Sequence, residues 1–147
     1  MKPTLLLAIP LGKAFEAKFT DRFEVSADMT PRAGVEALVT VGTIGADGAF
    51  MDGFPDLKII ACFGSGYESV DVAAAKARGI AVTNTVGANA ATVADLAVGL
   101  LLASMRHVVY GDAQIRAGKW RGDNVAKMLF TPSVTGRRVG IIGLGAI

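Results

Sequence analysis

The chain has 147 residues, of which 52% are hydrophobic and 18 are glycine, a composition that suits a compact domain and excludes a disordered chain. Its 15 basic and 13 acidic residues are nearly balanced and form no basic block, which argues against a nucleic-acid-binding protein. A single cysteine, Cys62, excludes a disulfide within the chain and a cysteine-based zinc cluster, so we expect no metal site and a reducing compartment.

The sequence predicts no membrane span or export signal. The apolar run Thr4–Ile9 is too short for a signal sequence, and Pro10 interrupts it at once. The longest apolar stretch, Leu96–Met105, covers about half of a bilayer and is typical of a core helix. We therefore expect a cytoplasmic protein without membrane partners.

Short apolar runs alternate with helical patterns over the first part of the chain. Strands are predicted at Thr4–Ile9, Phe23–Ser26, Ala37–Val41, Leu57–Cys62 and Ile80–Thr83. Helices are predicted between them at Ala14–Phe19, Gly45–Gly53 and Asp71–Arg78, the last with Asp71 as its N-cap and Gly79 as its stop. This alternation predicts an α/β fold, a flavodoxin-like doubly wound parallel sheet.

The second part of the chain is predicted to be different. A long helix over Asn89–Met105 is followed by a second helix over His107–Ala117 and by an irregular segment, Trp120–Thr135. A buried strand is then predicted at Arg138–Ile142. We expect residues 1–88 to form one domain, and residues 89–147 to hold interdomain helices, a dimerisation segment and the first strand of a second domain.

The predicted last strand runs into a glycine-rich turn. Gly143 and Gly145 match the first two glycines of a dinucleotide-binding fingerprint, which serve the tight turn and the close approach of a pyrophosphate. The chain stops one residue before the third glycine, so we expect the front half of a nucleotide-dependent enzyme. On these residues alone, the pair could also be an ordinary turn.

Two loops that leave predicted strands are candidate substrate sites. In the first, Gly64, Ser65 and Gly66 expose consecutive backbone amides at a strand end, where open α/β sheets bind ligands and where amides can hold a carboxylate. The second is Asn84–Asn89. The alternatives are a tight strand-to-helix connection for the first loop and a helix-capping turn for the second.

Several blocks in one order resemble the D-isomer-specific 2-hydroxyacid dehydrogenases, nearest the glyoxylate/hydroxypyruvate reductase branch. The resemblance covers Leu57 to Ile147 and rests on Gly64-Ser-Gly-Tyr-Glu-Ser-Val-Asp71, Gly79-Ile-Ala-Val-Thr-Asn-Thr85, Thr92-Val-Ala-Asp95, Gly118-Lys-Trp120 and Gly136-Arg-Arg-Val-Gly-Ile-Ile-Gly-Leu-Gly145. It implies a flavodoxin-like substrate domain followed by the start of a Rossmann dinucleotide-binding domain.

The resemblance also implies roles for single residues. The substrate carboxylate would lie on the Gly64 loop, on the amides of Ser65 and Gly66, and Trp120 could reach the active site of a neighbouring subunit. Thr92 would lie near the nicotinamide. The pyrophosphate turn would consist of Gly143, Leu144, Gly145, Ala146 and Ile147.

The chain departs from the family pattern at two places. Glu68 stands where the family usually has Asp, which leaves the backbone amides of the loop intact. Val86 and Gly87 stand where many members have Pro-Gly, which makes the second loop less rigid and leaves its exact path open.

The resemblance implies that the catalytic Arg, Glu and His of the family lie beyond Ile147, so we assign no catalytic residue. The only histidine, His107, is expected on a helix surface or at an interface. The complete enzyme would reduce a small 2-keto acid such as glyoxylate or hydroxypyruvate to the D-2-hydroxy acid. The cofactor would be NAD or NADP, because the residue that selects the ribose follows about twenty residues after the fingerprint.

Two other functions remain open on the sequence. One is a cofactor-sensing corepressor on the same scaffold, and the other is a free-standing flavodoxin-like ligand-binding module. The final apolar strand speaks against the second, because a natural domain rarely leaves such an edge uncovered.

The helix from Asn89 is apolar on nearly all sides and must be covered on nearly all sides. We expect the cover to be a second copy of the chain, giving a homodimer through the Asn89–Trp120 region. The alternative is cover by a cofactor domain of the same chain. One apolar stripe follows helical spacing and consists of Val93, Leu96, Ala97, Leu100, Leu101 and Ser104.

Overall fold

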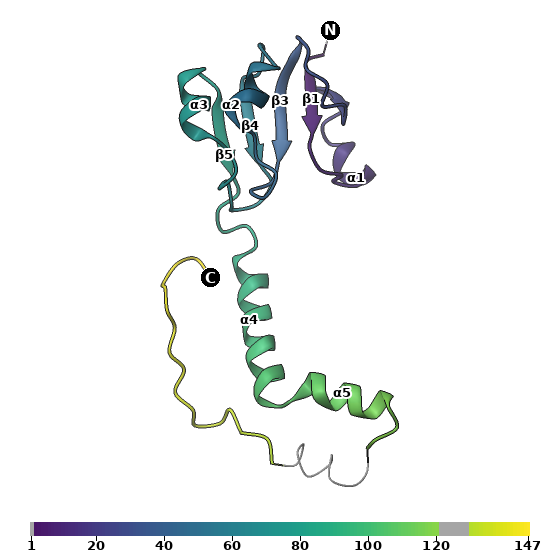
Figure 1. The fold of residues 1–147 in the computed structure, drawn as a ribbon, viewed down its shortest axis with the longest axis vertical. Helices are drawn as coiled ribbons and strands as arrows, with labels where there is room; N and C mark the ends of the chain where they lie inside the picture. The colour runs from purple at the N-terminus through teal and green to yellow at the C-terminus, as the bar shows by residue number, and fades with distance from the viewer. Residues whose placement is uncertain (1, 121–129) are drawn as a thin grey trace. The chain divides into compact units, whose positions relative to one another are not determined.

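The computed structural model describes residues 2–120 and 130–147 and divides the chain into two compact units, Met1–Ala88 and Asn89–Ile147 (Figure 1). The first unit contains every strand of the described residues, and the second contains the two longest helices. The assignment of these units to a substrate domain and to the beginning of a cofactor domain stays a prediction.

The first unit is built on a sheet of five parallel strands in the order β2-β1-β3-β4-β5. This order is that of flavodoxin-like doubly wound folds, and it confirms the predicted fold class. The strands are β1 (Thr4–Leu7), β2 (Glu24–Ser26), β3 (Val35–Thr40), β4 (Ile59–Cys62) and β5 (Ala81–Asn84).

Alternate side chains of the strands point to opposite faces of the sheet, and apolar side chains are buried on both faces at β1 and β3. At β4 and β5 only one face is covered, because Ile59, Ala81 and Thr83 on the other face are exposed. In β1, Leu6 belongs to one buried cluster, while Leu5 and Leu7 belong to another. The larger cluster contains residues from α2 (Gly48–Asp52) and α3 (Val72–Ala77), such as Met51 and Ala75. The helix α1 (Lys13–Glu16) is shorter than the predicted Ala14–Phe19, and its residues past Glu16 form turns.

The predicted capping residues end and begin the helices as expected. The carboxylate of Asp71 accepts the amide of Ala74 at 2.8 Å at the start of α3, and Gly79 adopts a φ of 71° just past its end. The helix α2 begins in the same way, because the carboxylate of Asp47 accepts the amide of Phe50 at 2.8 Å.

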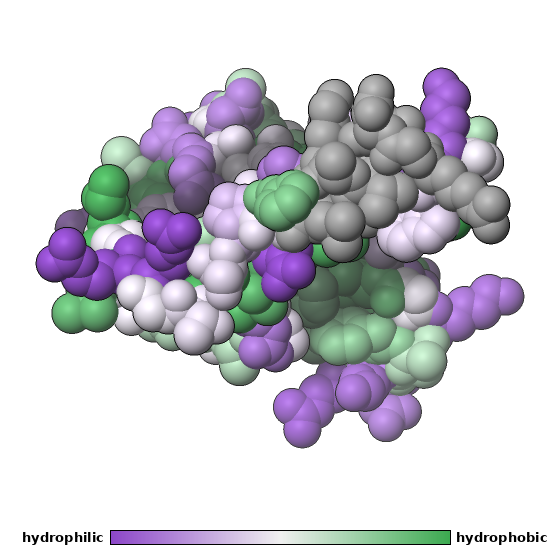
Figure 2. All heavy atoms as spheres, turned by 90° about the horizontal axis from the view of Figure 1, so that it is seen from below, coloured by the Kyte–Doolittle hydropathy of each residue, from purple (hydrophilic) through white to green (hydrophobic). Residues whose placement is uncertain are grey.

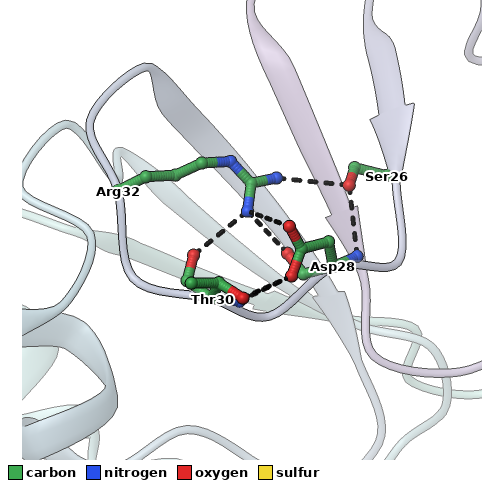
Figure 3. A network of polar contacts seen from close by, with 4 residues as sticks. All are labelled: Ser26, Asp28, Thr30 and Arg32. Carbon is green, nitrogen blue, oxygen red and sulfur yellow. Dashed lines mark hydrogen bonds and ion pairs between the residues drawn. The ribbon is translucent and has the colours of Figure 1, made fainter.

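A polar network holds the loop between β2 and β3 (Figure 3). Thr30 donates its hydroxyl to Asp28 Oδ1 at 2.6 Å, and Arg32 Nη1 lies 3.2 Å from Asp28 Oδ2. The hydrogen bonds from Thr30, followed by the charge of Arg32, hold the pKa of Asp28 below its ordinary value. Ser26, at the end of β2, accepts from Arg32 Nη2 at 3.2 Å, so the network ties the loop to the sheet.

The second unit contains α4 (Ala90–Met105) and α5 (Val108–Arg116), close to the predicted bounds. The two helices are bent by 63° at His107, which adopts the left-handed conformation with a φ of 51°. Within the described residues, no single helix is long and apolar enough to cross a membrane; only the bent pair of α4 and α5 reaches that length and composition.

The strand predicted at Arg138–Ile142 is wrong for this structure, because residues 138–142 form no strand. A strand needs a neighbour for its backbone N–H and C=O groups, and the described residues of the second unit contain no other strand. The irregular segment predicted at Trp120–Thr135 is irregular at residue 120 and at residues 130–135, and its residues 121–129 lie outside the described part.

Two loops of the first unit approach each other closely at Gly45, and this contact gives a test of the fold. A Cβ built on Gly45 would overlap the carbonyl oxygen of Ser69, and the φ of Gly45 is 69°. We expect Gly45→Ala to lower the free energy of unfolding by about 2 kcal/mol or more, from backbone strain and overlap together.

The matched control is Gly34→Ala, because Gly34 has a φ of 81° with open space around it. The free energy of unfolding of this variant should fall by only about 1 kcal/mol, the contribution of backbone strain without overlap. Urea unfolding followed by circular dichroism measures both variants. Equal losses for the two would contradict the close approach of the loops.

Candidate functional site

The register of the sheet brings three strand ends to the same level. Thr40 at the end of β3 is aligned with Cys62 at the end of β4, which in turn is aligned with Asn84 at the end of β5. Because the strands are parallel, the loops that follow them leave the same edge of the sheet. Both candidate loops of the sequence analysis therefore start side by side.

The two candidate loops are joined by hydrogen bonds around Thr85. The amide of Gly64 donates to the Thr85 hydroxyl at 3.0 Å, and the amide of Thr85 donates to the Gly64 carbonyl at 2.9 Å. Gly64 reaches this position with a φ of 135°, a region that favours glycine. The second loop thus fixes the conformation of the first.

Ser65 is held by two further bonds from the same loop. The side-chain amide of Asn84 donates to the Ser65 carbonyl at 2.8 Å, and the Ser65 hydroxyl donates to the Thr85 carbonyl at 3.4 Å. Both loops lie at strand ends, as predicted, whereas the bonds from Asn84 and Thr85 to Gly64 and Ser65 were not predicted. A polar pair directly after a strand is the local signal that points to such a role.

The amides of Ser65 and Gly66 are free donors near the start of this loop. Among the described residues, no hydrogen bond uses either amide, whereas the amide of Gly64 is taken by Thr85. Two successive unpaired amides that follow a glycine at positive φ are donors of the kind that bind an anion together. We call Gly64, Ser65 and Gly66 the amide loop.

The loop after β3 lies directly against the amide loop. A Cβ built on Gly42 would lie 2.7 Å from the carbonyl carbon of Gly66, so only glycine allows this approach. The carboxylate of Glu68 reaches back to the same place, because its Oε2 would lie 2.6 Å from a Cβ on Gly66 and 2.7 Å from one on Gly42. Glu68 therefore places a negative charge beside the amide loop.

This charge acts on the one thiol of the chain. Cys62 is buried at the end of β4. Burial, followed by the nearby negative charge of Glu68, raises the pKa of the Cys62 thiol above its ordinary value. At neutral pH the group is a neutral, buried thiol at the base of the amide loop, as expected for a small apolar residue.

The remaining predicted site residues lie in the second unit. Thr92 is in the first turn of α4, where its hydroxyl donates to the Asn89 carbonyl at 2.9 Å, and Trp120 is 50% exposed. Gly143 has a φ of 94°, as the expected tight turn requires, and the turn residues are exposed. The roles of these residues in binding stay predictions. Leu144, Gly145, Ala146 and Ile147, the other residues of the expected turn, are also exposed.

His107 lies at the bend between α4 and α5. It lines an apolar cavity of about 680 Å³ in the second unit, together with side chains such as Leu100 and Val109. In the described part of the chain, no three His, Cys, Asp or Glu side chains are grouped so that they could hold a metal ion.

The influence of Glu68 on Cys62 can be measured directly, because the chain has one cysteine. We expect Glu68→Gln to lower the pKa of Cys62 toward its ordinary value, since the substitution removes a negative charge that disfavours the thiolate. Burial should still hold this pKa above the ordinary value. Ultraviolet absorbance of the thiolate as a function of pH gives the pKa.

The matched control for this titration is Glu24→Gln, which makes the same change of charge on the edge strand β2. It should leave the pKa of Cys62 unchanged. A Cys62 pKa that does not move in Glu68→Gln would show that the carboxylate of Glu68 is turned away from the amide loop.

The chain matches the family model described as D-isomer specific 2-hydroxyacid dehydrogenase, catalytic domain, over residues 8–140. It is 43% identical to a glyoxylate reductase of Pyrococcus horikoshii, with all of this chain and 48% of that protein covered. Among solved structures, it is similar to a 2-hydroxyacid dehydrogenase from Ketogulonicigenium vulgare, with a TM-score of 0.80, 32% identity and coverage of 99% of this chain and 48% of that one.

A second similar structure is an NADPH-dependent glyoxylate/hydroxypyruvate reductase from Sinorhizobium meliloti in complex with NADP and malonate. Its TM-score is 0.76 and its identity 33%, with 99% of this chain and 47% of that one covered. The chain thus spans about half the length of the relatives it matches. With its doubly wound sheet, its amide loop and this match over residues 8–140, the chain belongs to the D-isomer specific 2-hydroxyacid dehydrogenase family.

Proposed function

We propose that this chain supplies the substrate-binding half of an oxidoreductase that reduces a small 2-keto acid to its D-2-hydroxy acid with a nicotinamide cofactor. The observation that carries the proposal is the pair of unpaired amides of Ser65 and Gly66 at the carboxyl edge of a parallel sheet. In this fold, ligands bind outside that edge. Membership of the family supports the reaction class.

The amide loop would hold the carboxylate of the substrate. Hydrogen bonds from backbone amides to a carboxylate are charge-assisted and stronger than neutral ones. Because Asn84 and Thr85 hold the loop from the side of β5, the two amides keep their positions without a ligand. Such preorganisation orients the keto acid at a small cost in conformational entropy.

The charge of Glu68 opposes the binding of any anion at the amide loop, and it opposes a substrate with two carboxylates more strongly than one with a single carboxylate. A second negative charge bound close to the amide loop would be repelled by the carboxylate of Glu68, which lies against Gly66. Glyoxylate and hydroxypyruvate each carry one carboxylate. Relatives with these substrates in their names, from Pyrococcus horikoshii and Sinorhizobium meliloti, support the same substrate class for this chain.

The residues expected to hold the cofactor match a pyrophosphate turn in residue type, whereas residues 138–142 before them form no strand. Gly143 adopts a φ of 94°, and neither Gly143 nor Gly145 has an atom within 4 Å of the place of a Cβ, so the turn is open to close approach. When bound in its reduced form, as NADH or NADPH, the cofactor would supply the hydride for the keto carbon and leave as NAD or NADP. Thr92 would lie beside the nicotinamide, and Leu144, Ala146 and Ile147 would line the pyrophosphate turn together with the two glycines.

The role of the carboxylate can be tested on the substrate side, in the complete enzyme. We expect methyl glyoxylate, which lacks the negative charge, to have a kcat/KM roughly a hundredfold below that of glyoxylate, the size of two charge-assisted hydrogen bonds lost. Steady-state oxidation of NADH and NADPH measures both substrates. Equal kcat/KM values for the ester and the acid would contradict a carboxylate site.

The 147-residue chain by itself serves as the negative control of this assay. We expect it to give no turnover with glyoxylate or hydroxypyruvate, because its predicted residues bind the substrate and part of the cofactor and include no proton donor. Turnover by this chain would overturn the division of roles and would bring His107 into consideration as a proton donor.

We further propose that the protein forms a homodimer through the Asn89–Trp120 region. No residue of α4 is buried, although the helix carries large apolar side chains; Leu96 is 61% exposed and Val109 of α5 is 76% exposed. Apolar side chains reach the surface on the face shown in Figure 2. Contiguous exposed apolar surface of this kind is typical of an interface. Trp120 would then lie where it can reach the partner's substrate.

A charge placed on α4 should weaken the association of the two subunits of the proposed dimer. We expect Leu96→Glu to convert the complete enzyme from a dimer to a monomer at micromolar concentration, because the buried carboxylate would have no partner. Light scattering gives the mass. The matched control is Ala73→Glu, on the exposed side of α3, which should stay dimeric. A monomeric wild-type enzyme would contradict the proposed dimer.

A further inference from the structure

We propose that Thr85, assisted by Asn84, is a positioning residue that selects which amides of the amide loop receive the substrate carboxylate. The inference rests on the carboxylate site proposed above and goes beyond it, because it assigns a role to two residues that would not touch the substrate. The loop offers three successive amides, on Gly64, Ser65 and Gly66. The side chain of Thr85 consumes the first of them.

The geometry around Thr85 indicates that its side chain does more than join the two loops. It determines which amides of the amide loop remain open to a ligand. Its backbone amide already donates to the Gly64 carbonyl at 2.9 Å, so the loops are joined without the side chain. The hydroxyl adds an acceptor for the Gly64 amide at 3.0 Å. This second bond removes the Gly64 amide from the set of donors open to a ligand, and the two amides that follow remain open.

Asn84 completes the arrangement on the other side of the peptide. Its side-chain amide donates to the Ser65 carbonyl at 2.8 Å, which fixes the plane of the peptide that carries the Gly66 amide. Thr85 therefore holds the backbone amide of Gly64, and Asn84 holds the peptide bond between Ser65 and Gly66. Both residues follow directly from β5, whose last residue is aligned with the last residue of β4.

The test uses the ¹⁵N-labelled 147-residue chain and oxamate, a stable analogue of a small 2-keto monocarboxylate. In the wild-type chain, the amide signals of Ser65 and Gly66 should shift with oxamate in a saturable way, and that of Gly64 should shift less. In Thr85→Val, the loop loses one neutral hydrogen bond that holds it in place before binding, so the Kd for oxamate should rise by up to about fivefold. The Gly64 amide, now an open donor, should respond to the ligand. Thr85→Ser, which keeps the hydroxyl, should stay within about twofold of wild type.

The matched control is Thr83→Val, which makes the same change on β5 at an exposed residue without a side-chain bond to the amide loop. It should bind oxamate like the wild type. Asn84→Ala is the second variant, for the case that the spectrum of Thr85→Val shows an unfolded chain. Asn84→Ala should bind oxamate more weakly than the wild type, and the signal of its Gly64 amide should not respond to oxamate.

The outcomes separate the two proposals. Wild-type amides that do not respond to oxamate would overturn the carboxylate site, and the positioning role with it. A wild-type response that Thr85→Val retains in full, with a silent Gly64 amide, would overturn the positioning role alone. A merely structural role of Thr85 would not make the Gly64 amide sensitive to the ligand.

Discussion

The alignment of three parallel strand ends is the constraint on which the rest of the candidate site depends. Thr40, Cys62 and Asn84 lie at the same level of the sheet, and each is followed by a loop at the same edge. A slip of one residue in β5 would move Asn84 and Thr85 away from their acceptors and turn their side chains to the other face. The hydrogen bonds of the amide loop are thus a consequence of the sheet register.

Glycine lets the loops approach as closely as this register demands. Gly42 and Gly45 lie where any side chain would overlap the loop after β4, and Gly64 adopts a φ that other residues avoid. The result is a site made almost entirely of backbone, with one charged side chain, Glu68, at its side. A backbone site is insensitive to many substitutions of its own residues, so its chemistry is tuned by the residues that hold and surround it.

The sequence predicted the first unit well because its signals are local. Asp71 and Gly79 mark the ends of α3, and both act as predicted. The bonds from Thr85 to Gly64 were not predicted, since they join residues about twenty positions apart and depend on the strand register. The strand at Arg138–Ile142 was predicted from apolar residues alone, but a strand forms only beside a partner, and the described part of that unit has none.

The candidate site was predicted in part and by two routes. The glycines of the amide loop followed from their place after an apolar strand, whereas the roles of Ser65 and Gly66 followed from the family resemblance. The structure adds that these two amides are the unpaired ones among the described residues of the loop. Glu68 was noted only as a departure from the family pattern, and its position against Gly66 and Gly42 needed the folded chain.

The most direct test of the account is a crystal structure of the protein with oxamate bound. The account predicts a carboxylate oxygen within hydrogen-bonding distance, about 2.9 Å, of the amide nitrogens of Ser65 and Gly66. The amide of Gly64 should remain bonded to the Thr85 hydroxyl. A carboxylate bound away from these two amides, or one that displaces Thr85 from Gly64, would contradict the account.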